Sequence, residues 1–589
     1  MQQRTLGGEA AGRSFFGGTR SRTRTGALIV VALAGSVLTL LFQLPGILAT
    51  LAAAALIYIV TANTHTGSLQ QRWANKRRWK ERGRLGLRDF QPLHRRPAGL
   101  DPNVGTRTDK AAAALAWNAY RDWPDGAEGM HWLQRERGMP GIAWHTPTGE
   151  AAYLSVVFAV SGQVRGVEGD RFLDGCSAAF GQLLARYGSP LALPNRVQKI
   201  TRVLPTDSAR HEAWVMAGLA PDAPRLLLES YDQVVKRTGR RGLMQRHYVV
   251  IRWPLTPTFI ASAQRLGRAQ HGWRQLMARE VQAAGRHLVA ARLGEVAALS
   301  AAQTAAVLRH MQIPSWPIDQ AADVDVASPW CPTHDEWSYT AATDVGPTGQ
   351  VESWFHRTAL VPIAAVETGP RTSLWLAPLL SQLGDQIVRT ISIQTELVPA
   401  AEARADARTD VTSDLADMAA QREKGILTDD DLKVGLTGAR ARLDDLTPGS
   451  GHHGAGWAMH ITISARSRDQ LADASAKIAE AAGNAGITDL SWLDTQQAAA
   501  QSCTWPIGRG MKPIGASLGG WLRTTAAGSG AKEDSHDRCP ATRLAVHRSR
   551  PAGPTRTRRR RRTGRGTRAS SPGSTPRTSR RPGGSPVPA

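Results

Sequence analysis

The sequence holds few residue patterns that could bind a metal. Cys331 and His334 are spaced as a CxxH pair, and His452, His453 and His460 follow much later in the chain. Zinc sites are usually built from two tight ligand pairs held in ordered loops. Here the first pair falls in a proline-rich stretch, and His460 falls on the polar face of a predicted strand. We therefore predict no metal site, and expect surface histidines and a buried free cysteine instead.

The sequence also argues against nucleotide-driven catalysis. A P-loop needs Gly-Lys-Ser/Thr, because its lysine must reach the β- and γ-phosphates of the nucleotide. None of the ten lysines follows a glycine, and neither HExxH nor CxxC occurs. The acid pairs Asp335-Glu336 and Asp444-Asp445 are typical of helix starts or solvated charges. The sequence thus excludes a Walker-type ATPase and predicts a protein that is not an enzyme, with no catalytic residue and no cofactor.

The formal net charge of +24 is concentrated at the two ends of the chain. Residues 1–96 carry a net charge of +12, residues 536–589 carry +14, and the residues between them carry −2. The near-neutral middle gives no general electrostatic case for nucleic-acid binding. The four cysteines are far apart in the sequence, which fits a reducing compartment better than a disulfide scaffold.

Residues 26–61 contain no charged side chain, and Pro45-Gly46 interrupts them near the midpoint. The run is too long for one membrane span and suits two short ones. Arginines flank both ends, at residues 20–24 and 72–78, and the positive-inside rule places both flanks in the cytoplasm. The pattern predicts a transmembrane helical hairpin in the inner (cytoplasmic) membrane, with both termini cytoplasmic. A single tilted span and a cleaved signal peptide are the alternatives.

The segment after this run interleaves Trp73 and Trp79 with Arg72, Lys76, Arg77, Arg78 and Lys80. Aromatic side chains at headgroup depth beside cations that face anionic lipid would form an interfacial anchor to the bilayer. Nucleic-acid binding by the same cations is the alternative interpretation.

The middle of the chain alternates between strand and helix patterns, which predicts an α+β fold with ferredoxin-like units. Strands are expected at 153–160, 197–204, 246–253, 387–397, 457–464 and 487–493, and helices at 110–120, 171–187, 208–217, 400–423 and 429–444. A long helix-prone stretch covers residues 259–311. In the strand at 387–397, alternate residues are apolar on one face and polar on the other.

From about residue 536 the chain consists of Arg, Pro, Ser, Gly and Thr, with almost no large apolar residues. Such a composition predicts disorder, although a reading-frame artefact or a basic binding tail around Arg558–Arg562 are alternatives. The predicted organisation is a basic N-terminus (1–25), the hairpin (26–61), a basic juxtamembrane segment (62–96), an α+β region (97–515) and a disordered basic tail (516–589).

Several segments, taken in order, resemble an actinobacterial integral membrane family of conjugation and type IV secretion clusters. They are the PrgI-like hairpin at 26–61, RHYVVIRW at 246–253, WCPTHDEW at 330–337, WLAPLL at 375–380, VRTISIQTELVPAAEA at 388–403 and TWPIGRGM at 504–511, together with Ser230-Tyr231 and WFHRT at 354–358. The family is similar in layout to a PrgI-like hairpin joined to a CagE/TrbE-like amino-terminal domain that lacks the ATPase motor.

The resemblance implies a non-catalytic inner-membrane scaffold of a secretion or DNA-transfer apparatus, which docks a separate ATPase and other channel subunits. It covers roughly residues 1–515 and assigns no role to the tail. The alternatives are a membrane component of a type VII secretion system and a membrane-tethered protein that binds nucleic acid through its basic ends.

Overall fold

Strands from most of the chain join one sheet in the computed structural model. The structure describes residues 4–6, 22–61, 69–162, 168–206, 214–220, 222–239, 242–316, 318, 324–345, 349–383, 386–423 and 430–511. The chain divides into two compact units, Met1–Pro513 and Ile514–Ala589, and the fold below belongs to the first. The predicted disordered tail lies outside the described residues.

The sheet has 14 strands in the order β3-β2-β10-β11-β12-β15-β14-β7-β8-β6-β5-β4, with β16 on β12 and β9 on β6. The pair β2 and β3 is parallel, and the other pairs are antiparallel. The strands are β2 (Asp89–Pro92), β3 (Tyr120–Arg121), β4 (Met130–Gln134), β5 (Ile142–His145), β6 (Tyr153–Val160), β7 (Arg196–Pro205), β8 (Leu243–Pro254), β9 (Val296–Ala298), β10 (Thr333–Asp335), β11 (Thr340–Val345), β12 (Val351–Val361), β14 (Val388–Val398), β15 (Gly454–Ala465) and β16 (Ser491–Trp492). A separate two-stranded pair joins β1 (Arg4–Leu6) to β13 (Gly369–Arg371).

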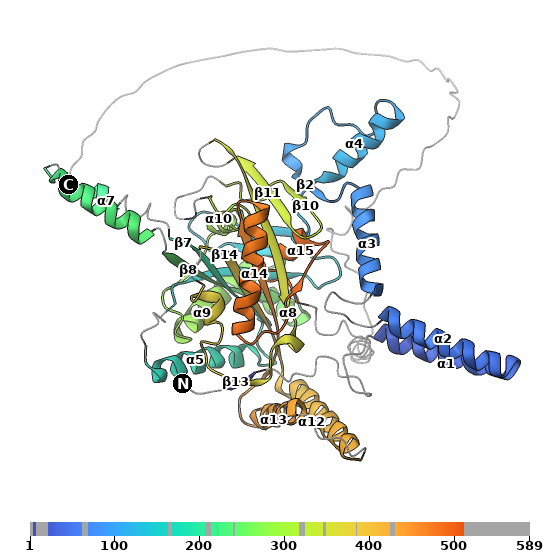
Figure 1. Ribbon diagram of the computed structural model, residues 1–589. Coiled ribbons are helices and arrows are strands. Elements are labelled where there is room, and N and C mark those ends of the chain that lie inside the picture. Colours follow the sequence, from blue (N-terminus) through green and yellow to red (C-terminus); the bar gives the residue numbers. More distant parts are fainter. Residues whose placement is uncertain are drawn as a thin grey trace, which may run out of the picture. The chain divides into compact units, whose positions relative to one another are not determined.

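Helices connect many of the strands, and α9, α10 and α14 pack on the sheet (Figure 1). The helices of the described residues are α1 (Arg22–Phe42), α2 (Leu44–Thr61), α3 (Leu69–Arg84), α4 (Arg107–Ala119), α5 (Asp170–Tyr187), α7 (Arg225–Gly239), α8 (Pro257–Gln264), α9 (Ala269–Ala290), α10 (Ala301–Gln312), α11 (Ala377–Leu380), α12 (Ala400–Glu423), α13 (Asp430–Asp445), α14 (Arg468–Asn484) and α15 (Gln497–Ser502). The predicted helix-prone stretch 259–311 is thus divided into α8, α9 and α10, with the short strand β9 before α10.

Both faces of the sheet are buried. Along β6, Val156 and Phe158 pack with residues of α5 and α9, whereas Val157 points to the other face and packs with α10 and Trp505. The alternation follows from the two-residue period of a strand. On β12, β14 and β15, α14 covers the side of the sheet that packs on α5 and α9 at β6. Leu471 and Ile478 of α14 join the core there. The prediction of ferredoxin-like units is replaced by one continuous mixed sheet, in which β15 and β16 both pair with β12.

The polar faces of β14 and β15 are buried as well. Thr390, Ser392 and Gln394 of β14 are at most 1% exposed, because the segment from α15 to Met511 crosses this face. Gln198 of β7 links the layers: its side-chain nitrogen donates to Ser392 Oγ at 2.9 Å and to the Trp505 carbonyl at 2.9 Å. The polar side of β14 is therefore an internal layer that is largely hydrogen-bonded.

The predicted transmembrane hairpin is wrong. The uncharged residues do form two adjacent helices, α1 and α2, but no helix among the described residues is both long and apolar enough to cross a membrane. The first turn of α1 contains Arg22 and Arg24, which shortens its apolar part. The same finding overturns the predicted integral-membrane character and the inner-membrane location with both termini cytoplasmic.

The two helices meet two residues earlier than the sequence suggests. The chain turns at Gln43, whose φ of 47° lies in the left-handed region, and Pro45 falls within the first turn of α2. A Cβ atom on Gly46 would lie 2.4 Å from the Leu38 carbonyl oxygen. Glycine at this position therefore allows α1 and α2 to approach closely.

Candidate functional site

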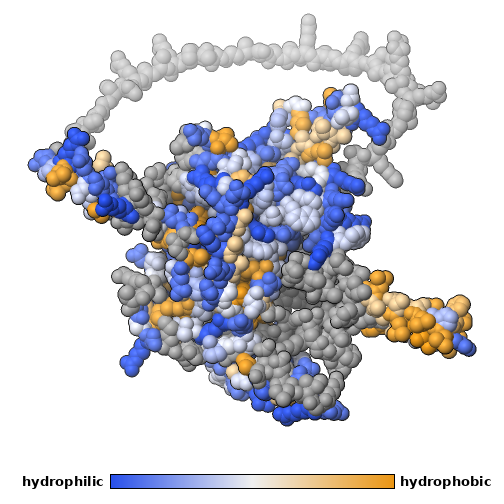
Figure 2. Space-filling view, viewed as in Figure 1, coloured by the Kyte–Doolittle hydropathy of each residue, from blue (hydrophilic) through white to orange (hydrophobic). Residues whose placement is uncertain are grey.

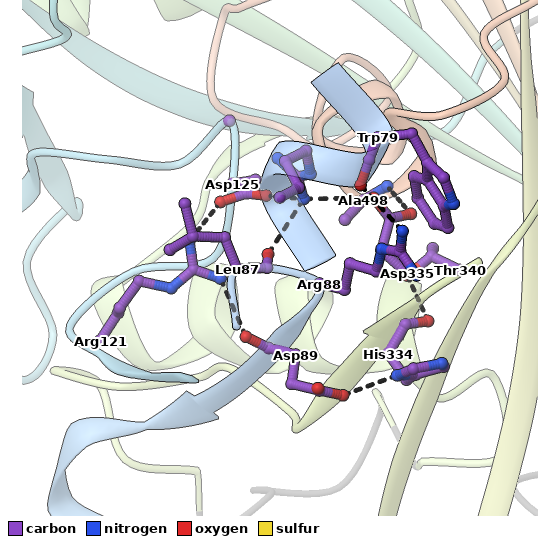
Figure 3. Close-up of polar contacts among 12 residues, drawn as sticks. Trp79, Leu87, Arg88, Asp89, Arg121, Asp125, His334, Asp335, Thr340 and Ala498 are labelled. Carbon is purple, nitrogen blue, oxygen red and sulfur yellow. Dashed lines mark hydrogen bonds and ion pairs between the residues drawn. The ribbon is translucent and has the colours of Figure 1, made fainter. Parts of the chain in front are cut away.

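The C-terminal turn of α3 is fixed to the sheet by a cluster of charged side chains, shown in Figure 3. Nη2 of Arg82 lies 2.5 Å from Oδ2 of Asp125 and 3.2 Å from Oδ2 of Asp335, and it donates to the Leu87 carbonyl at 3.1 Å. Arg121 holds the other oxygen of Asp125 at 2.5 Å. One guanidinium of α3 thus joins two carboxylates that come from distant parts of the chain. We call this group, with the Trp79–Arg88 contact described below, the α3 anchor.

Asp335 is the innermost residue of the α3 anchor. Its side chain is 0% exposed, and Oδ1 accepts a hydrogen bond from the backbone N–H of Ala498 at 3.2 Å. Burial raises the pKa of Asp335 to about 6, although the charge of Arg82 opposes the shift. The backbone N–H of Asp335 donates to the Arg88 carbonyl at 2.8 Å, which links β10 to the segment after α3.

Aromatic contacts complete the α3 anchor. The guanidinium of Arg88 lies 3.8 Å from the centroid of the Trp79 ring, and its Nη2 donates to the Trp79 carbonyl at 2.8 Å. Trp79 also meets Trp337 edge to face at 5.9 Å. Stacked guanidinium–indole pairs and edge-to-face indoles are attractive arrangements. The side of α3 that carries Trp79 and Arg82 is therefore packed on the sheet.

His334 lies beside the α3 anchor on β10. Its Nδ1 is 2.6 Å from Asp89 Oδ1, and its Nε2 is 3.3 Å from Glu336 Oε1. Partial burial alone would lower the pKa of His334, but the hydrogen bonds and charges of these two carboxylates outweigh burial and raise it. The imidazole is therefore paired with carboxylates on both sides.

The rest of α3 presents positive charge to solvent. Its sequence contains seven Arg and Lys residues and a single acid, Glu81. Apart from Arg82, these cations are exposed: Arg72, Lys76, Arg77, Arg78, Lys80 and Arg84. Trp73 is also exposed (64%), and the guanidinium of Arg77 lies 5.7 Å from the centroid of its ring. The sequence indicated a basic, aromatic segment here, and the structure shows that Trp73 faces out whereas Trp79 faces in.

A concave feature lies beside the sheet-edge strand β4. It has a volume of about 860 Å³ and is lined by residues that include Trp123, Trp132, His131, Arg135 and Asp122. Its tryptophans are hydrogen-bonded within the wall: Trp123 Nε1 donates to the Met130 carbonyl and Trp132 Nε1 to the Val326 carbonyl. These bonds give the pocket a fixed aromatic wall.

Cys331 and His334, the CxxH pair considered for metal binding, lie in different environments. Cys331 is fully buried, and burial raises the pKa of its thiol to about 11, while His334 is occupied by Asp89 and Glu336. Within the described residues, no three His, Cys, Asp or Glu side chains gather where they could hold a metal ion.

The later histidines also lie in different environments. His460 is 4% exposed within β15, and burial lowers its pKa to about 4. His453 Nδ1 accepts from the backbone N–H of Ala400, whereas His452 is exposed. The prediction of surface histidines is thus wrong for His460.

The acid pairs behave differently from each other. Asp444 and Asp445 are exposed at the end of α13, as a solvated charge pair would be. The same interpretation is wrong for Asp335, which is buried in the α3 anchor. No local pattern marked it, because its partner Arg82 is 253 residues away.

Comparison with models of known protein families and with curated proteins gave no match.

Proposed function

We propose that this protein is a non-catalytic scaffold subunit of a conjugative or type IV-like secretion or DNA-transfer apparatus, and that it docks a separate ATPase. The proposed apparatus rests on the ordered series of motifs that ends with TWPIGRGM at residues 504–511. The absence of any Gly-Lys pair in the sequence supports a separate motor, because the chain then lacks the lysine that a P-loop requires.

The exposed apolar surface of α1 and α2 is the observation that carries the docking role. Figure 2 shows apolar residues gathered over these two helices. Thirteen large apolar side chains there are at least 39% exposed: Ile29, Val30, Leu33, Val37, Leu38, Leu40, Leu41, Phe42, Leu44, Ile47, Leu48, Leu51 and Leu56. Contiguous apolar surface on a folded protein marks an interaction site, because leaving it in water is unfavourable. We assign this surface, the hairpin face, to contact with another component.

The body formed by the sheet and its packed helices suits a platform. Its strands form one continuous sheet, and both sheet faces are closed by packed helices or by the segment 497–511. Interiors packed in this way deform little, so surfaces carried on them keep their geometry. A closely packed body joined to an exposed apolar surface is an arrangement for assembly.

Co-purification would test the proposal. The full-length protein is expressed with a type IV secretion ATPase from the same organism, and each protein is affinity-purified in turn. We expect the ATPase to co-purify with the wild-type chain and to fall to background with Leu40→Gln/Leu44→Gln/Leu48→Gln, which removes apolar area from the hairpin face.

A matched control changes apolar residues of similar exposure on another helix. Leu226→Gln/Leu227→Gln/Val234→Gln on α7 alters side chains that are 76%, 63% and 56% exposed. This control should retain the ATPase. Failure of the wild-type chain to retain the ATPase would contradict the docking role. Equal retention of the ATPase by the two triple variants would show that the hairpin face does not contact it.

A further inference from the structure

The exposed cations of α3 recur with the period of the helix. Lys76, Lys80 and Arg84 are spaced four residues apart and are all exposed, so they lie on one side of α3. Successive members are separated by about 6 Å along the axis, at 1.5 Å per residue. Arg77 adds charge beside this row, whereas Arg78 lies on another side of the helix, where its Nη2 donates to Asn75 Oδ1 at 3.0 Å.

The α3 anchor makes this row a fixed surface. Arg82 and Trp79 hold the other side of the helix through contacts to Asp335 and Arg88. A positively charged surface that is already ordered loses less conformational entropy when it binds a ligand. The anchor therefore preorganises the row.

An aromatic ring lies at the beginning of the row. Trp73 is 64% exposed, and Arg77 approaches its ring at 5.7 Å. Binding sites for single-stranded nucleic acid combine cations that follow the phosphate backbone with aromatic side chains on which bases stack. Repeated cations suit a ligand with repeated anionic charge, and the exposed indole suits one that also carries flat rings.

We propose that the outer side of α3 binds single-stranded nucleic acid without sequence preference. Lys76, Lys80 and Arg84 contact phosphates, and Trp73 stacks on a base. This assignment is independent of the hairpin face, since it uses a different helix and a different class of partner.

Fluorescence anisotropy with the full-length protein and a labelled oligo-dT strand, measured across a salt series, tests the proposal. Each phosphate contact contributes about 0.7 to the slope of log affinity against log salt for a single strand. Lys76→Gln/Lys80→Gln/Arg84→Gln should therefore reduce the magnitude of the slope by about 2. Trp73→Ala should lower affinity by about tenfold and leave the slope unchanged, because it removes stacking and no charge.

Two controls separate this surface from general charge and from exposed aromatic area. Arg265→Gln/Arg279→Gln/Arg286→Gln removes the same charge from exposed positions in and beside α9, and should keep the wild-type slope. Trp214→Ala removes an indole that is 73% exposed elsewhere and should keep the wild-type affinity.

The proposal is overturned if the α3 and α9 triple variants have the same salt slope, since binding then lies in other cations. Unchanged affinity of Trp73→Ala overturns the stacking contact. Loss of binding to phosphatidylserine vesicles by the α3 variant, with oligo-dT binding intact, would overturn the nucleic-acid assignment in favour of anionic lipid.

Discussion

The guanidinium of Arg82 lies 3.2 Å from the carboxylate of Asp335, although 253 residues separate them in the sequence. Arg82 is 24% exposed, whereas the Asp335 side chain is wholly buried. A buried carboxylate is costly unless a cation or hydrogen-bond donors compensate for its lost hydration. The pair therefore ties the last turn of α3 to β10, and its removal should affect both the stability of the body and the order of the helix.

We expect Arg82→Gln to lower the free energy of unfolding at pH 7 by about 2–3 kcal/mol. The loss should be smaller than the 3–5 kcal/mol typical of a fully buried pair, because water partly reaches Arg82. Hydrogen exchange of the α3 amides should speed up at the same time. Arg84→Gln, on an exposed residue of the same helix, is the matched control and should stay within about 0.5 kcal/mol of wild type. Equal effects of the two substitutions would contradict the role given to Arg82.

The raised pKa of Asp335 predicts a pH dependence of stability. Burial raises this pKa from 3.8 to about 6 in the folded state, so the folded protein binds the proton more tightly than the unfolded chain does. The contribution to stability is fully present below about pH 4 and is lost as the pH rises through about 6.

Denaturant unfolding of the wild type and Asp335→Asn from pH 4 to pH 8 measures this dependence. The stability of the wild type relative to Asp335→Asn should fall across that interval, because asparagine does not titrate. Parallel pH profiles for the two proteins would show that Asp335 has an ordinary pKa in the folded state.

A buried ion pair in the centre of the sheet predicts a strong coupling. Arg196 of β7 is 1% exposed, and its Nη2 lies 3.0 Å from Oε2 of Glu396 on β14. Glu396→Gln should cost about 3–5 kcal/mol in thermal or denaturant unfolding, since the buried guanidinium then keeps only Glu150, at 3.5 Å and shared with Arg252, as a countercharge. The double variant Arg196→Met/Glu396→Leu should cost less than the sum of the single changes.

An exposed pair supplies the comparison for this measurement. Arg225 and Glu229 on α7 lie 2.8 Å apart but are 91% and 55% exposed. Glu229→Gln should change stability by less than about 1 kcal/mol, because water screens the pair. A similar cost at both sites would show that burial does not determine the strength of the pair at Glu396.

The segment after α15 should be essential for folding of the body. Trp505 is 1% exposed and stacks on Trp330 with their ring centroids 5.5 Å apart. Trp505→Ala should cost about 3–5 kcal/mol, since it opens a large cavity in the core that also contains Val157 and Ile200.

Truncated chains test whether α15 and the segment after it are needed for cooperative folding. A chain that ends at Gln496 should fail to give a cooperative unfolding transition, because the polar layer on β14 would be exposed without its partners. A chain that ends at Pro513, the boundary of the first unit, should unfold like the full-length protein. Cooperative unfolding of the shorter chain would show that the segment is only a peripheral cover.

The sequence by itself located the central strands β6, β7, β8, β14 and β15, but not β2 to β5 or β10 to β12. The strand predicted at 153–160 is β6 and the helix predicted at 400–423 is α12, each with the same bounds. Such elements follow from hydrophobic periodicity and from the residues that end them, which are properties of neighbours in the chain. The same local information also predicted the two helices of the uncharged run at 26–61. The prediction that these helices cross a membrane was wrong.

The tertiary structure decided which local patterns are buried and which residues meet. The polar row of β14 alternates with apolar residues in sequence, yet it is buried under the segment after α15, and Gln198 bonds both to Ser392 and to the Trp505 carbonyl. Asp335 resembles a surface charge, yet it is buried against Ala498 and paired with Arg82. Both outcomes depend on segments far apart in the chain, and pairing over such distances leaves no periodic signal around either partner. The charges of α3 could be read from the sequence, whereas the direction in which they face is set by the contact between Arg82 and Asp335.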